Sequence, residues 1–194
     1  MENALERLNR LPANEARAEL LACCGSSSWA REMAVRRPFG DPAELFAAAD
    51  EIWRGCNRED WLEAFASHPQ IGEKRAEKQM ESAAGQQLAS RWSADEQSVA
   101  ARNSADVATK LADGNRLYRE RFGYIFIVCA TGKTAPEMLA ILEQRLQNDA
   151  SAELLIAAEE QRRITRLRLQ KLLATQPREE SARQTTGERR LDKS

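Results

Sequence analysis

The sequence predicts an all-α protein: a single multi-helix domain over residues 1–173, followed by a disordered polar tail over 174–194. Apolar residues recur three or four positions apart in one segment after another, with helix-capping residues between the segments. Helix-favouring Ala, Leu, Glu, Arg and Gln are abundant, whereas there are only 9 Gly and 6 Pro. The tail has Leu191 as its only large aliphatic residue, which is too little apolar surface for a core.

The first predicted helices are short and clearly delimited. Leu5 and Leu8 lie on one face of the first, and the second ends at Gly25. A third carries Trp29 and Met33, four residues apart on one face.

Two further helices begin with recognisable caps. Asp41 and Pro42 suit the N-cap and first position of a helix that stops at Gly55. Asn57 caps the next one, with Asp60 three residues on. That helix ends at the segment 67–69, because a residue before proline is pushed away from the α region.

The second half of the chain contains further helical segments and one exception. Residues 72–92 are polar, and we expect a surface excursion or a lid; helices are then predicted from Ser93, up to Phe122, over 134–146 and over 152–173. The exception is 124–130, Tyr-Ile-Phe-Ile-Val-Cys-Ala, which alone is typical of a buried strand. No other segment offers it a partner strand, so a sheet is not expected.

His68 is the only histidine of the chain and precedes Pro69 at a predicted helix exit. Histidine can both give and take protons near neutral pH, so His68 is the candidate for acid–base chemistry through an imidazole. The alternative is a surface residue or a hydrogen-bonded core residue, which is the more frequent role of a single histidine.

Two other residues could act with it. Glu96 either closes a capping box with Ser93 or orients and polarises an imidazole, and Gln97 adds an amide beside it. Arg168 falls on the apolar stripe of the last predicted helix, between Ile164 and Leu172. Such an arginine needs an internal carboxylate, a path to solvent, or a substrate anion. Its neighbours Arg162, Arg163 and Arg166 are interpreted as solvated.

Composition and motifs exclude several functions. The net charge is −1, with 29 basic and 30 acidic residues, so nucleic acid is not an expected partner. The four cysteines and single histidine form no metal-ligand pattern, and no metal is expected. Thr131–Thr134 lacks the upstream glycine of a phosphate loop, and a hydrolase triad has little support.

A Cys129 nucleophile paired with His68 stays open. A charged N-terminus and short apolar runs predict a cytoplasmic protein without a membrane span.

Several motifs together carry a family resemblance. They are SHPQIG at 67–72, the S-x-x-E-Q pattern at 93–97, FGYIFIVCATGK at 122–133, and E-x-x-R-I-x-x-L-R-L at 160–169. In this order they resemble the decarboxylases of 2-oxo-4-hydroxy-4-carboxy-5-ureidoimidazoline (OHCU), over about residues 1–173. The resemblance implies an all-helical fold and a carboxy-lyase that needs no cofactor. The implied reaction turns a small ureidoimidazoline substrate into (S)-allantoin and CO2, the last step from urate to allantoin.

The resemblance also implies roles for particular residues. His68 would be the general acid/base, Glu96 the assisting carboxylate, and Arg168, rather than Arg163, the anion-binding arginine. Substrate-binding segments would fall on Pro69, on residues 93–97 including Ser93 and Gln97, and on the backbone of Phe126, Ile127, Val128, Cys129 and Ala130. Family members are often homodimers.

Two alternatives remain at the level of sequence. A helical protein-interaction module would keep His68, Glu96 and Arg168 far apart, whereas an enzyme would bring them together. A hydrolase of a related ureide would use a similar pocket for ring opening instead of decarboxylation.

Overall fold

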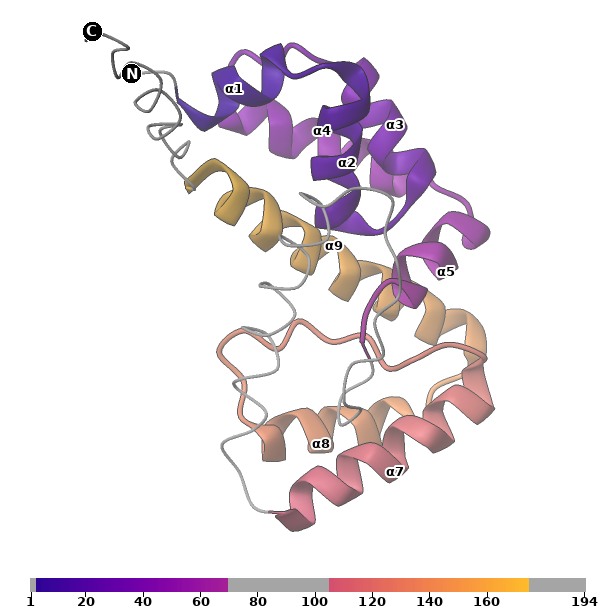
Figure 1. The fold of residues 1–194 in the computed structure, drawn as a ribbon. Coiled ribbons are helices and arrows are strands. Elements are labelled where there is room, and N and C mark those ends of the chain that lie inside the picture. Colours follow the sequence, from indigo (N-terminus) through magenta and orange to yellow (C-terminus); the bar gives the residue numbers. More distant parts are fainter. Residues whose placement is uncertain (1–2, 70–104, 175–194) are drawn as a thin grey trace, which may run out of the picture.

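The computed structural model describes residues 3–69 and 105–174, and every regular element in those ranges is an α-helix (Figure 1). The all-α prediction is therefore confirmed for the described part of the chain. The helices are α1 (Ala4–Arg10), α2 (Ala13–Cys24), α3 (Ser27–Val35), α4 (Pro42–Gly55), α5 (Arg58–Ala66), α7 (Ala105–Phe122), α8 (Ala135–Arg145) and α9 (Ala150–Ala174). The predicted lid over 72–92, the helix start at Ser93, and all of the predicted tail beyond residue 174 lie outside the described residues.

The predicted helix starts are confirmed where the structure describes them. Asp41 accepts a hydrogen bond from the Glu44 amide, with Pro42 in the first turn of α4. α5 and α8 each begin with a complete capping box, formed by Asn57 with Asp60 and by Thr134 with Glu137.

α9 is the helix against which most of the N-terminal helices pack. It packs against α1, α2, α4 and α5, while α7 and α8 pack against each other at the other end of the molecule (Figure 1). The indole of Trp53 on α4 donates to the Ala158 carbonyl of α9 at 2.9 Å. The stripe predicted for this helix is buried: Ala157, Ile164, Arg168 and Leu172 are at most 5% exposed.

The apolar segment 124–130 joins α7 to α8 without helix or strand. Side chains take the place of a partner strand: Arg145 Nη1 donates to the Ile127 carbonyl at 2.7 Å, and Glu160 Oε2 accepts from the Cys129 amide at 2.7 Å. Lys133 Nζ donates to the Cys129 carbonyl at 2.6 Å. Because buried backbone groups need partners, these three side chains let the segment lie inside the protein without a sheet.

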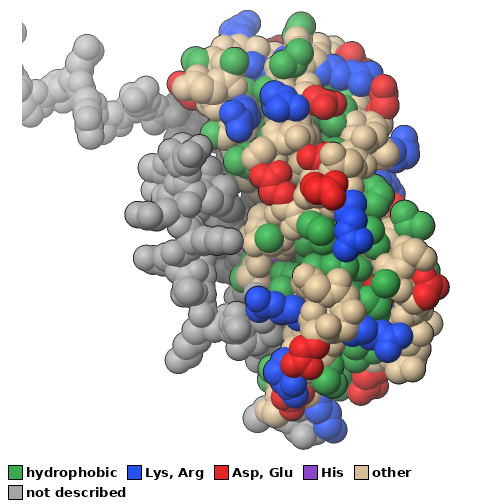
Figure 2. Space-filling model, turned by 90° about the vertical axis from the view of Figure 1, so that its right-hand side faces the viewer, with side chains coloured by type: hydrophobic (Ala, Val, Ile, Leu, Met, Phe, Trp, Pro, Cys, Tyr) green, Lys and Arg blue, Asp and Glu red, His purple; other side chains and the backbone are tan. Residues whose placement is uncertain are grey.

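The surface carries both signs of charge. On the face shown in Figure 2, Lys and Arg side chains alternate with Asp and Glu rather than gathering by sign. Among the helices described, none has the length and apolar content that crossing a membrane requires.

Candidate active site

His68 lies where the chain leaves α5. The helix ends at Ala66, with Ser67 as its C-cap, and the His68 amide donates to the Phe65 carbonyl at 3.2 Å. The predicted exit before Pro69 is therefore confirmed. The imidazole is partly buried and is directed to α9.

Two residues of α9 contact the two ring nitrogens of His68. Nε2 lies 2.7 Å from Gln161 Oε1, and Nδ1 lies 3.4 Å from Arg168 Nη2. Gln161 and Arg168 are seven positions apart, which places them on one face of the helix about two turns from each other. The imidazole fits between them, so α9 fixes both its position and its orientation.

The surroundings of His68 favour the neutral imidazole. Removal of the ring from water, together with the Arg168 charge, lowers the pKa of His68 from 6.5 to about 3, while the Gln161 hydrogen bond opposes the shift. In the absence of substrate, His68 is therefore a neutral group that can accept a proton.

This pKa predicts a pH dependence of stability. Between pH 6.5 and about 3 the unfolded chain holds a proton on His68 that the folded chain does not, so unfolding takes up a proton. Lowering the pH from 6.5 therefore reduces the free energy of unfolding, by up to about 1.4 kcal/mol per pH unit for this one group. Urea unfolding between pH 4.5 and 7.5 should show a steeper loss for the native chain than for His68→Asn. Equal slopes would contradict the assigned pKa.

Arg168 is the arginine that α9 places at the site. It is 4% exposed and lies against His68, whereas the Arg163 side chain is 54% exposed and pairs with Glu159 and Glu160. The interpretation of Arg163 as solvated is confirmed. That of Arg162 is wrong in part: it is half-buried, because its guanidinium reaches Asp50 on α4 at 2.9 Å.

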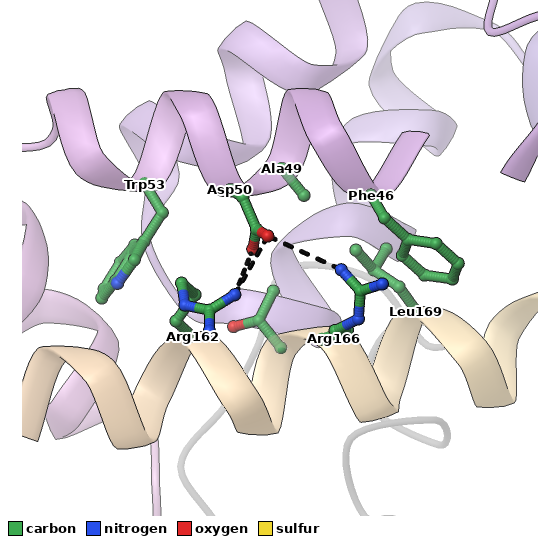
Figure 3. A pocket seen from close by; sticks show the side chains of 8 residues that line it. Phe46, Ala49, Asp50, Trp53, Arg162, Arg166 and Leu169 are labelled. Carbon is green, nitrogen blue, oxygen red and sulfur yellow. Dashed lines mark hydrogen bonds and ion pairs between the residues drawn. The ribbon is translucent and has the colours of Figure 1, made fainter. Parts of the chain in front are cut away.

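A small hollow lies between α4 and α9, away from His68, and Asp50 lines it (Figure 3). Asp50 accepts from Arg162 and lies 3.5 Å from Arg166, whose guanidinium stacks over the Phe46 ring at 4.7 Å. The Asp50 carboxylate of α4 thus pairs with the two arginines of α9. These contacts hold the two helices together, and we assign no ligand to the hollow.

The remaining predicted residues divide into two groups. Phe126, Ile127, Val128 and Cys129 are buried, and Ala130 and Pro69 are half-buried. Cys129 is tied to α9 through Glu160, the neighbour of Gln161, so the segment and the imidazole are held by adjacent residues of one helix. Ser93, Glu96 and Gln97 lie outside the described residues.

Sequence reasoning missed Gln161 and Glu160. Gln161 does fall on the predicted stripe, four residues after Ala157 and seven before Arg168. A polar residue on an inward stripe at that spacing was therefore a usable signal. Glu160 is the first residue of the motif at 160–169, but the motif assigned it no role of its own.

Gly25 lies close against the turn that carries His68. It has φ +88°, and an added Cβ would lie 2.1 Å from Ser67 Oγ and 2.7 Å from Ser67 Cβ. Gly123 has φ +82° with nothing within 4 Å of such a Cβ, so it offers a matched control.

We expect Gly25→Ala and Gly123→Ala each to lose about 1–2 kcal/mol of stability from the left-handed backbone. Gly25→Ala should lose about 1–3 kcal/mol more from the clash with Ser67. Only this variant should shift the NMR signals of the single histidine. Equal losses with unchanged histidine signals would show that Gly25 has no influence on the site.

The pair His68 and Arg168 bears on the interaction-module alternative. That alternative predicts the two residues far apart, and their contact shows that this is wrong for this pair. The fold and the site together define an all-helical protein in which one long helix holds a neutral histidine beside a buried arginine.

Comparison with known proteins identifies the family. A sequence model of OHCU decarboxylase matches residues 9–170. The chain therefore belongs to the OHCU decarboxylase family.

Similar proteins and a solved structure support the same family assignment. The uric acid degradation bifunctional protein TTL of Arabidopsis thaliana is 42% identical over 157 residues, 80% of this chain and 47% of that protein. The chain thus spans about half the length of this relative. The OHCU decarboxylase of Haloferax volcanii is 28% identical over 87% of this chain and 95% of its own. A crystal structure of OHCU decarboxylase in the presence of (S)-allantoin superposes with TM-score 0.68 and 41% identity, covering 81% of this chain and 99% of that one.

Proposed function

We propose that this chain decarboxylates OHCU to (S)-allantoin and CO2 without a cofactor, as the last step from urate to allantoin in purine catabolism. The contact between His68 and Arg168 carries the proposal. It sets a group that can move protons beside a buried cation that suits an anionic substrate. The 41% identity to an OHCU decarboxylase solved in the presence of (S)-allantoin supports the same reaction.

The chemistry of the substrate fits these groups. In OHCU one ring carbon carries both the carboxylate and a hydroxyl, and its ring neighbour belongs to a C=N bond. When CO2 leaves, the electron pair of the broken C–C bond forms a double bond between the two ring carbons. The π pair of the C=N bond moves onto its nitrogen, which takes a proton from water. The enol that remains loses its hydroxyl proton and gains a proton on the neighbouring carbon, which gives allantoin. The ring itself delocalises the electron pair.

The residues have distinct roles in this scheme. His68 takes the hydroxyl proton and delivers a proton to carbon. Arg168 holds an anionic group of the substrate with its planar guanidinium. Glu96 assists as the carboxylate that the family pattern assigns. Pro69, Ser93, Gln97 and the backbone of 126–130 surround the substrate. Proton delivery from one side gives one enantiomer.

Labelled substrate distinguishes this reaction from ring opening. OHCU generated freshly with ¹³C in its carboxylate should release the label as CO2, faster with the protein than without it. A hydrolase would leave the label in a carboxylic acid product. Retention of the label in such a product would reject the decarboxylase assignment and favour the hydrolase.

We also propose that the protein works in the cytoplasm as a homodimer. All four cysteines are free, as is usual in a reducing compartment. The homodimer is implied by the family resemblance, and light scattering on the purified chain tests it.

A further inference from the structure

Gln161 has its side-chain amide fixed in one orientation. The residue is fully buried on α9, and its Nε2 donates to the Cys24 carbonyl at 2.9 Å and to Thr165 Oγ1 at 3.3 Å. A backbone carbonyl can only accept, so the NH2 group must face Cys24. The amide oxygen then faces His68, 2.7 Å from Nε2.

This orientation determines which nitrogen of His68 carries the proton. An amide oxygen has no proton to give, so Nε2 must be the donor. On the other side of the ring, Arg168 Nη2 lies 3.4 Å from Nδ1, and a guanidinium has no acceptor. Both partners therefore select the same neutral tautomer, with a proton on Nε2 and a lone pair on Nδ1.

We propose that Gln161 is a positioning residue that holds His68 in the Nε2–H tautomer, so that Nδ1, on the Arg168 side, is the atom that exchanges protons with the substrate. The proton exchange at Nδ1 rests on the proposed function, whereas the assignment of the tautomer is independent of it. The proposal explains why a fully buried glutamine occupies this place: its two donors and its acceptor are all used, and they join α9 to α2 and to the turn that follows α5.

The opposite tautomer would be disfavoured on both sides. A lone pair on Nε2 would face the Gln161 oxygen, and a proton on Nδ1 would face the Arg168 guanidinium. The native amide thus does for this imidazole what a carboxylate does in a catalytic triad, without adding charge. A neutral partner leaves the pKa of His68 low, as the burial and the Arg168 charge set it.

The single histidine makes the tautomer directly measurable. With ¹⁵N-labelled histidine, both ring nitrogens belong to His68 without assignment, and their shifts distinguish Nε2–H, Nδ1–H and the imidazolium. The native chain at pH 7 should show neutral Nε2–H. An Nδ1–H pattern would overturn the proposal.

Two variants of Gln161 test its role, and one other glutamine of α9 supplies the control. Gln161→Met removes the acceptor on Nε2 and leaves Arg168 as the one described partner that still favours Nε2–H, so Nδ1–H should become detectable beside it. The value of kcat for OHCU should fall about 10- to 100-fold with less change in KM. Gln161→Glu keeps an acceptor and adds charge, so Nε2–H should persist while the pKa of His68 and the pH profile of kcat/KM move upward. Gln170→Met, on the exposed side of the same helix, should change neither the tautomer of His68 nor kcat.

The outcomes separate the proposal from its premise. A Gln161→Met chain that keeps pure Nε2–H, or that loses only stability with an unchanged pH profile, would assign Gln161 a merely structural role and overturn the proposal. A native chain with the expected tautomer but no OHCU turnover would instead overturn the proposed function.

Discussion

His68→Asn should lower kcat for OHCU decarboxylation about 10²- to 10⁴-fold, which is the usual contribution of a positioned acid or base. KM should change less, because the variant retains Arg168 for the substrate anion. The measurement is the rate of allantoin formation from freshly generated OHCU, corrected for spontaneous decay.

Loss of the imidazole also has a structural consequence that the experiment must separate from catalysis. The buried Gln161 oxygen loses its donor, which destabilises the fold by about 1–3 kcal/mol. The double variant His68→Asn/Gln161→Met removes both members of this hydrogen bond, but also the donor to the Cys24 carbonyl, so it should recover at most part of the lost stability and none of the activity. Helix content by circular dichroism confirms folding in each case. A kcat close to that of the native chain would exclude His68 as the acid/base.

Glu153→Gln should destabilise the protein by about 3–5 kcal/mol, because it leaves Arg145 as an uncompensated buried charge. Arg145 and Glu153 are 6% and 0% exposed, and Arg145 Nε donates to Glu153 at 2.7 Å. The Tyr118 hydroxyl also donates to Glu153, and Arg145 holds the Ile127 carbonyl. The variant should therefore disturb segment 124–130 and with it the activity. Chemical unfolding in urea measures the loss.

The pair Arg116 and Glu120 on α7 provides the control. Its charged groups lie 3.0 Å apart with side chains 61% and 60% exposed. Glu120→Gln should therefore change stability by about 0–1 kcal/mol. Similar losses for the two glutamine variants would show that the buried cluster does not hold the segment.

Much of the fold could be predicted because it depends on local patterns. Asp41 with Pro42, and Asn57 with Asp60, are recognisable caps within four residues of sequence, and the structure has helices beginning there. The stripe of α9 follows from apolar spacing alone, and it correctly placed Arg168 on the inward face. The lack of a partner strand for 124–130 likewise followed from the rest of the sequence.

The site could be predicted only in part, because its contacts join distant positions. Gln161 and His68 are 93 positions apart in the sequence, and no local pattern predicts which polar side chain will accept a hydrogen bond from the imidazole. The partners of charged side chains are equally hard to predict from sequence. Arg162 and Arg163 are adjacent, but of these two it is Arg162 that pairs with a residue of α4. The neighbouring helix determines which charged side chain becomes buried. The sequence periodicity predicts only the side of the helix on which that side chain lies. The role of Glu96 comes from the family pattern and stays a prediction.

The handedness of the allantoin formed shows whether the protein delivers the proton to carbon from one side. Freshly generated OHCU is mixed with the native chain, and circular dichroism follows the optical activity of the allantoin formed as CO2 is released. Delivery of a proton from the His68 side predicts a signal of the (S) enantiomer whose rate rises in proportion to protein concentration. An optically inactive product, formed at the spontaneous rate however much protein is added, would show that the protein does not catalyse this decarboxylation.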